Sequence, residues 1–368
     1  MSRQRSRHKR KNRRRKNFLT AVLMIALLGC MGLIIFIMQD ILFQQKENEQ
    51  AVQMAMDGQA EVSAEGELAE AAVSPTPEPT ATPTPTPQPL YAGDILLQPG
   101  FEAVETEATF APDEAMVGST NSLLIDLSND TIIAEKGAKE RISPASMTKV
   151  LTILVAAEHI QNPDDLFTVT SEMTSYSLVN GCNAAGFVGG ETVSVRDLCY
   201  GTILPSGGEA ALALATYVAG SHEAFVELMN QKIEELGLSD TAHFTNCIGL
   251  YDENHYCTAY DMAMIMKAAI ANDFAREVLS TKVYTTAMTE QNPEGLILSN
   301  WFLRRIEDKD CGGTVVAAKT GFVNESGNCA VSYFVSASGR PYLCVTLHAV
   351  SSWSCIYDHV AMYLNYTA

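Results

Sequence analysis

A serine and a lysine that could carry out nucleophilic chemistry stand three residues apart in Ser146-Met147-Thr148-Lys149. The apolar run that follows, VLTILVAA, has helical character, so a helix opening at Ser146 would place Lys149 one turn along on the same face. A neutral lysine can act as the base that activates a serine hydroxyl, and burial or a second cation lowers the pKa of a lysine. A capped helix with a surface lysine would have the same pattern.

A second candidate element, Lys319-Thr320-Gly321, lies in the predicted strand VVAAKTGFV. On a strand, Lys319 and Gly321 point to one side and Thr320 to the other, and glycine lets the backbone approach a ligand closely. The lysine and the hydroxyl could bind a substrate carboxylate, and Lys319 could be the cation that lowers the pKa of Lys149. An ordinary edge-strand lysine is the alternative.

The elements that must position these residues follow from periodicity and turn signals. An early hairpin is expected from strands at 121–127 and 131–135, followed by helices at 209–219, 221–236 and 258–271. Three late strands are expected at 315–323, 328–337 and 342–350, and a last helix at 353–366. Thr258 to Asp261 resembles a capping box. We expect an α/β (α+β) fold, in which hairpin and late strands form one antiparallel sheet flanked by helices beside a helical lobe. A ligand cleft would lie between sheet and lobe.

The first 38 residues predict a membrane anchor. Ten of the 25 Lys and Arg residues lie in 1–16, whereas all 43 acidic residues come later. Residues 18–38 form 21 uncharged positions, enough to cross a hydrocarbon core of about 30 Å, and the cations before them favour a cytoplasmic N-terminus. A cleaved signal peptide has an apolar stretch of only about 7–15 residues. A lipoprotein signal ending at Cys30 is the other alternative, and a nucleic-acid-binding tip is not expected.

The expected organisation has four parts: a basic cytoplasmic tip at 1–17, a transmembrane helix at 18–38, a disordered stalk at 39–110 with a Pro/Thr-rich linker at 74–89, and an extracellular domain at 111–368. Proline fixes φ and removes a donor, so the linker favours an extended chain. The protein is therefore expected in the cell membrane, single-pass, with its domain outside.

Eight of the nine cysteines lie after the predicted anchor, where disulfides can persist. Eight cysteines allow 105 pairings, so the sequence cannot assign disulfides, and free buried thiols are an equal alternative. No CxxC spacing appears and the histidines are scattered, so neither a zinc ribbon nor a zinc carboxypeptidase is expected. We expect no metal and no cofactor.

Between the two candidate elements stands a third, Ser206-Gly207-Gly208, at the start of a helical stretch. This order of motifs, with the flanks ISPASMTKVLT, HFTNCIGLYDENHYCTAYDMA and AAKTGFVNESGNCAVSYF, resembles the low-molecular-mass penicillin-binding serine D-alanyl-D-alanine carboxypeptidases. The resemblance covers about residues 121–350. It implies that the partners are peptidoglycan stem peptides and β-lactam antibiotics, with no nucleic acid.

The resemblance also implies catalytic functions for three residues. Ser146 would attack the carbonyl between two terminal D-alanines, Lys149 would take its proton, and Ser206 would relay that proton to the leaving amine. The same likeness implies a substrate-binding group, in which Lys319 and Thr320 hold the terminal carboxylate beside Gly321. The backbone N–H groups of Ser146 and Phe322 would form the oxyanion hole.

Gly208 departs from the family pattern, which usually has Asn at this substrate-binding position. An Asn restored there is expected to raise acylation if the loop has room, unless another group, such as Glu209 or a water, already fills the gap. Cys247 and Ile248 replace a usual Pro-His pair in a segment expected to be structural.

Two other functions remain as alternatives. A non-catalytic wall-binding or penicillin-sensing module is supported only by Gly208. A class A β-lactamase would need a deacylating E-x-x-L-N segment, and no such pentapeptide occurs between Ser206 and Lys319.

Overall fold

The computed structural model of the chain describes residues 102–367. The predicted basic tip, the predicted transmembrane helix at 18–38 and the Pro/Thr-rich linker lie outside the described residues. Within residues 102–367, no helix is both long and apolar enough to cross a membrane.

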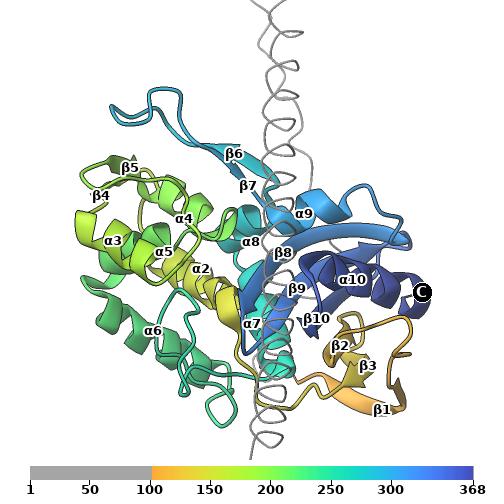
Figure 1. Cartoon of the computed structure of the whole chain (residues 1–368). Helices are drawn as coiled ribbons and strands as arrows, with labels where there is room; N and C mark the ends of the chain where they lie inside the picture. Colours follow the sequence, from red (N-terminus) through yellow and green to blue (C-terminus); the bar gives the residue numbers. More distant parts are fainter. Residues whose placement is uncertain (1–101, 368) are drawn as a thin grey trace, which may run out of the picture. The chain divides into compact units, whose positions relative to one another are not determined.

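A six-stranded sheet forms the centre of the described domain, with the strand order β1-β3-β2-β10-β9-β8 (Figure 1). Its strands are β1 (Val104–Phe110), β2 (Asn121–Asp126), β3 (Thr131–Lys136), β8 (Gly313–Val323), β9 (Gly327–Ser336) and β10 (Pro341–Ala349). The β2–β3 hairpin joins the late strands because β10 pairs antiparallel with β2, with Leu124 opposite Cys344. The predicted union of early hairpin and late strands in one sheet is confirmed.

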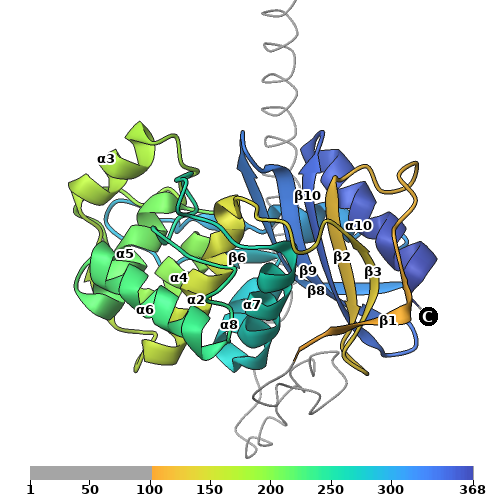
Figure 2. The same cartoon turned by 90° about the horizontal axis from the view of Figure 1, so that it is seen from below.

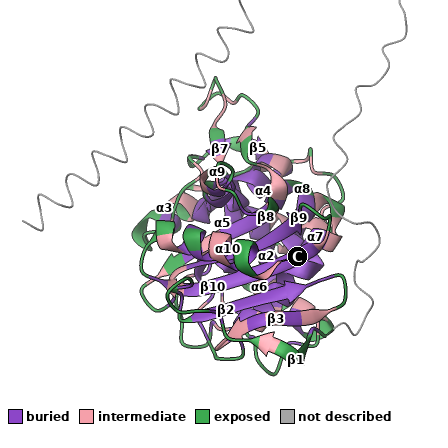
Figure 3. Cartoon of the chain, turned by 90° about the vertical axis from the view of Figure 1, so that its right-hand side faces the viewer, coloured by how far each residue is buried: buried purple, intermediate pink, exposed green. Residues whose placement is uncertain are grey.

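The edge strand β1 corrects two expectations. It pairs parallel with β3, so the sheet is mixed rather than wholly antiparallel. It also lies inside the range assigned to a disordered stalk, so the fold begins before residue 111. Its sequence, VETEATF, is polar, and every residue of the strand is exposed except Thr109, which is half-buried. Figure 3 shows this strand in exposed and intermediate colours beside the buried central strands.

The central strands are apolar on both sides because the sheet separates two hydrophobic cores. On β2, Leu123 and Ile125 point into the larger core, whereas Leu124 points into the smaller one. Successive side chains of a strand face opposite ways, so both faces need apolar residues when both are covered by helices.

Helices cover each face of the sheet (Figure 2). On one face lie α9 (Trp301–Ile306) and α10 (Ser352–Tyr366), which pack in the smaller core. The other face and the lobe beside it hold the remaining helices: α2 (Thr148–His159), α3 (Ser171–Val179), α4 (Val195–Ile203), α5 (Gly208–Ala219), α6 (His222–Glu235), α7 (Ala259–Ala271) and α8 (Asp273–Ser280). The capping box predicted at Thr258 is confirmed, with Asp261 as its partner.

Two small antiparallel pairs complete the described fold, β4 (Leu166–Thr168) with β5 (Thr192–Ser194) and β6 (Val283–Thr285) with β7 (Ile297–Ser299). All eight cysteines between residues 102 and 367 are free thiols, and all but Cys182 are buried. The disulfide alternative therefore does not apply to this part of the chain.

Candidate active site

Ser146 stands in a single 3-10 turn, Ala145–Met147, that leads directly into α2. Lys149 lies one turn further on, and its Nζ donates to Ser146 Oγ at 3.1 Å and to the carbonyl oxygen of Ile248 at 2.7 Å. The second contact fixes the ammonium group beside the serine hydroxyl. The Ser-x-x-Lys spacing therefore produces the expected pair in space.

The turn before Ser146 is held tightly by a neighbouring loop. Ala145 has φ +47°, a left-handed conformation that is costly for a residue with a Cβ. Gly249 packs on it so closely that a Cβ at Gly249 would lie 1.9 Å from the Ala145 oxygen. The segment around Ile248, expected to be structural, thus positions both the base and the backbone of the nucleophile.

Burial sets the charge state of the lysine. Lys149 is only 1% exposed, and this burial lowers its pKa to about 8, although the carboxylate of Glu209 partly opposes the shift. The pKa of Lys319 is also well below its usual range, first through burial and then through the charge of Lys149. The sequence suggested Lys319 as the cause of the Lys149 shift, whereas the main cause is burial.

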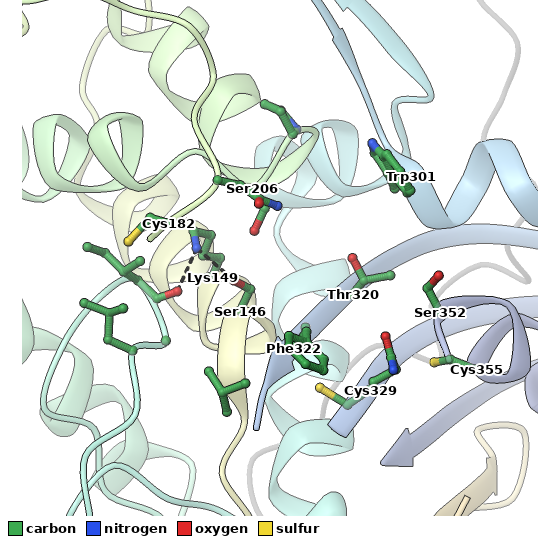
Figure 4. Close-up of a pocket in the computed structure, with 18 of the residues that line it drawn as sticks. Ser146, Lys149, Cys182, Ser206, Trp301, Thr320, Phe322, Cys329, Ser352 and Cys355 are labelled. Atoms are coloured by element: carbon green, nitrogen blue, oxygen red, sulfur yellow. Dashed lines mark hydrogen bonds between the residues drawn. The ribbon is translucent and has the colours of Figure 1, made fainter. Parts of the chain in front are cut away.

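Ser206 faces the same site from the loop that precedes α5. It has φ +68° and is 6% exposed, and its Oγ has no hydrogen-bond partner among the described residues. Figure 4 shows Ser206 close to Lys149 and Ser146, with Cys182 on the far side of the lysine. A hydroxyl held there without a partner is available to a group that enters the site.

The position of Gly208 is filled from another segment. A Cβ on Gly208 would lie 2.6 Å from Ser177 Oγ and 2.7 Å from the Cβ of Cys182. The segment bearing Cys182 is held against the start of α5 by three hydrogen bonds. Gly208 N donates to the Asn183 oxygen at 2.8 Å, and the Glu209 carboxylate accepts from the backbone N–H groups of Ala185 and Gly186. The loop therefore has no room for an Asn at 208, because Ser177 and Cys182 occupy the space that its Cβ would need.

Strand β8 brings the Lys-Thr-Gly element to the opposite side of Ser146. Thr320, Gly321 and Phe322 line the cleft, whereas Lys319 is 2% exposed and its Nζ donates to the Thr320 oxygen at 2.8 Å. A Cβ on Gly321 would lie 3.0 Å from Ser146 N. The glycine is needed because the backbone of the nucleophile approaches β8 closely.

These residues surround one cleft of about 440 Å³. Six of the eight residues expected in the site line it, namely Ser146, Lys149, Ser206, Thr320, Gly321 and Phe322, while Lys319 and Gly208 are buried behind its surface. Sequence reasoning missed several other lining residues: Cys182, Asn183, Trp301, Arg305, Ser352 and Cys355. They lie in loops and helices without a motif, so only the three-dimensional arrangement identifies them.

Comparison with known proteins places most of the described domain in one family. The family described as D-alanyl-D-alanine carboxypeptidase matches residues 107–351. The D-alanyl-D-alanine carboxypeptidase DacF of Bacillus subtilis is 29% identical over 57% of this chain and 52% of its own length. DacD of Escherichia coli is 33% identical over 55% of this chain and 53% of its own length. The chain spans about half the length of these two curated relatives.

A solved structure gives a likeness over most of the described domain. The DD-transpeptidase of Streptomyces K15 is 27% identical to this chain, with a TM-score of 0.62. The match covers 70% of this chain and 98% of that one.

Proposed function

Because the chain belongs to the D-alanyl-D-alanine carboxypeptidase family, we propose that it is a serine-type D-alanyl-D-alanine carboxypeptidase. It removes the terminal D-alanine from peptidoglycan stem peptides through an acyl-enzyme on Ser146, and penicillins acylate the same residue. The observation that carries the proposal is the buried Lys149, whose Nζ lies 3.1 Å from Ser146 Oγ with a pKa of about 8.

The reaction follows from the three polar groups around the cleft. Neutral Lys149 accepts the Ser146 proton while Oγ attacks the carbonyl carbon between the two D-alanines. The carbon–nitrogen bond then breaks, and the leaving amine takes a proton from Lys149 through the Ser206 hydroxyl. Water hydrolyses the acyl-enzyme, which restores the serine and releases the shortened peptide.

Two backbone N–H groups, those of Ser146 and Phe322, would stabilise the oxyanion that forms during attack. Support comes from the close packing of β8 on the Ser146 turn, where a Gly321 Cβ would touch Ser146 N. A glycine at that position keeps the backbone of β8 close to the Ser146 turn, so that one N–H group from each can donate to the same oxygen.

The non-catalytic alternative depended on the missing amide at Gly208. Cys182 fills that space, and the nucleophile, the base and the Ser206 hydroxyl are all in place around the cleft. These observations favour turnover over a sensing module.

We also propose that residues 18–38 form a single-pass anchor that keeps the domain on the extracellular side of the cell membrane. The support is the run of 21 uncharged residues directly after ten Lys and Arg residues.

The test is release of D-alanine from an N-acylated L-Lys-D-Ala-D-Ala peptide by the purified full-length chain. The expected result is steady release by the unmodified protein and none by Ser146→Ala, whose melting temperature should be unchanged. A protein that forms an acyl-enzyme with penicillin but releases no D-alanine would favour the sensing module.

A further inference from the structure

The substrate of the proposed reaction ends in a carboxylate, and the cleft must hold that charge. Lys319 is not exposed to do so, because its ammonium is buried and donates to a backbone oxygen of its own strand. Lys149 is needed as a neutral base. Among the described residues that line the cleft, Arg305 is the only other charged side chain, and none is acidic.

Arg305 is held in a fixed orientation by two aromatic rings. Its guanidinium carbon lies 3.7 Å from the centroid of the Trp301 ring and 4.9 Å from that of Trp353. A planar guanidinium between two rings loses little further entropy when it binds, and its N–H donors match the two oxygens of a carboxylate. Trp301 comes from α9 and Trp353 from α10, so the stack also joins the two helices.

The short helix that carries Arg305 is tied to the strand that carries Thr320. Asn300 accepts from the N–H groups of Phe302 and Leu303 at the start of α9, and its amide donates to the Ala318 oxygen on β8 at 3.1 Å. This connection fixes the distance between the arginine and the β8 side of the cleft. Figure 4 shows Thr320, Ser352 and Trp301 around the same end of the cleft, on the side of Ser146 away from Lys149.

We propose that Arg305 binds the terminal carboxylate of the substrate, with the hydroxyls of Thr320 and Ser352 as further donors. The inference rests on the proposed carboxypeptidase function and names the group that selects a free C-terminus. Lys319 then acts indirectly, by holding the Thr320 backbone in place.

The experiment compares Arg305→Gln with Arg304→Gln in the full-length chain. Arg304 is the adjacent residue of the same helix, it is exposed, and its guanidinium reaches Ser299 rather than the cleft. Each protein is assayed with two peptides, one ending in D-Ala-D-Ala with a free carboxylate and the other ending in D-alaninamide. A charge-assisted bidentate contact predicts that Arg305→Gln lowers kcat/KM for the acid peptide by about 10- to 100-fold.

The amide peptide provides the selectivity readout. Its slower turnover should be nearly the same in all three proteins, so that the preference for the free carboxylate shrinks only in Arg305→Gln. Arg305→Lys should recover part of the loss, because it restores the charge without the planar fork. Melting temperatures identify any variant that is merely unfolded.

Two results would overturn the proposal. One is a kcat/KM for the acid peptide within about twofold of the unmodified protein in a folded Arg305→Gln. The other is an equal loss for both peptides, which would show a structural effect. If the unmodified protein cleaved neither peptide, releasing no D-alanine from the acid peptide and no D-alaninamide from the amide peptide, the carboxypeptidase function itself would fail, and this outcome is distinct from both.

Discussion

Adding a side chain at Gly208 should damage the site rather than improve it. The Cβ of Gly208→Ala would lie 2.6 Å from Ser177 Oγ and 2.7 Å from the Cβ of Cys182. The serine hydroxyl can rotate away, but the Cys182 Cβ can move only with its backbone. That backbone is anchored by the Gly208 N–H and by Glu209. Overpacking of this kind costs about 1–3 kcal/mol, and Gly208→Asn should cost at least as much.

Displacement of the Cys182 segment should also slow acylation, because Cys182 and Ser206 line the same cleft as Lys149. A displacement that raises the barrier by about 1.4 kcal/mol lowers the rate tenfold, so we expect acylation to fall by at least about tenfold. The melting temperature should fall by about 2–4 °C for each kcal/mol lost.

The assay is the second-order acylation rate constant with a fluorescent penicillin, measured together with the melting temperature. Gly220→Ala is the matched control, because Gly220 follows the other end of the same helix and a Cβ there meets no atom within 4 Å. Its positive φ should lower stability without lowering acylation. A rise in acylation for Gly208→Asn, or unchanged values for Gly208→Ala, would show that Ser177 and Cys182 leave room for a side chain at this position.

Three further outcomes follow from the structure and the sequence. The acylation rate should rise with pH and level off above the Lys149 pKa of about 8, which burial has lowered, because only neutral Lys149 accepts the Ser146 proton. A flat profile between about pH 6 and 9 would exclude Lys149 as the base. Gly249→Ala should abolish acylation or folding, since its Cβ would overlap the Ala145 oxygen, and an active Gly249→Ala protein would show that this contact is dispensable. External protease on protoplasts should release an active fragment by cutting the segment before β1; a protected domain would reverse the proposed topology.

Local patterns predicted the elements that depend on local interactions. The capping box at Thr258 and the β2–β3 hairpin follow from side chains a few residues apart, and both are present. The Ser146–Lys149 pair is also local, because one helical turn brings the two residues together. The strand β1 was missed because its sequence is polar and its partner, β3, is not adjacent in the chain.

Contacts between distant segments could not be predicted in the same way. Cys182 against Gly208, and the Ile248 carbonyl on Lys149, join loops whose approach depends on the whole lobe. The burial of Lys319 could not be predicted either, because the alternation along a strand indicates which face of the sheet a side chain occupies but not which elements cover that face. Arg305 carries no motif and becomes prominent only where α9 and α10 meet.

The central claim is that Ser146 is the nucleophile of this cleft. Peptide mapping by mass spectrometry of the full-length protein after brief exposure to penicillin tests it directly. One penicilloyl adduct per chain is expected, on the peptide that contains Ser146, and none in Ser146→Ala. An adduct on another residue, or labelling that survives in Ser146→Ala, would show that Ser146 is not the nucleophile.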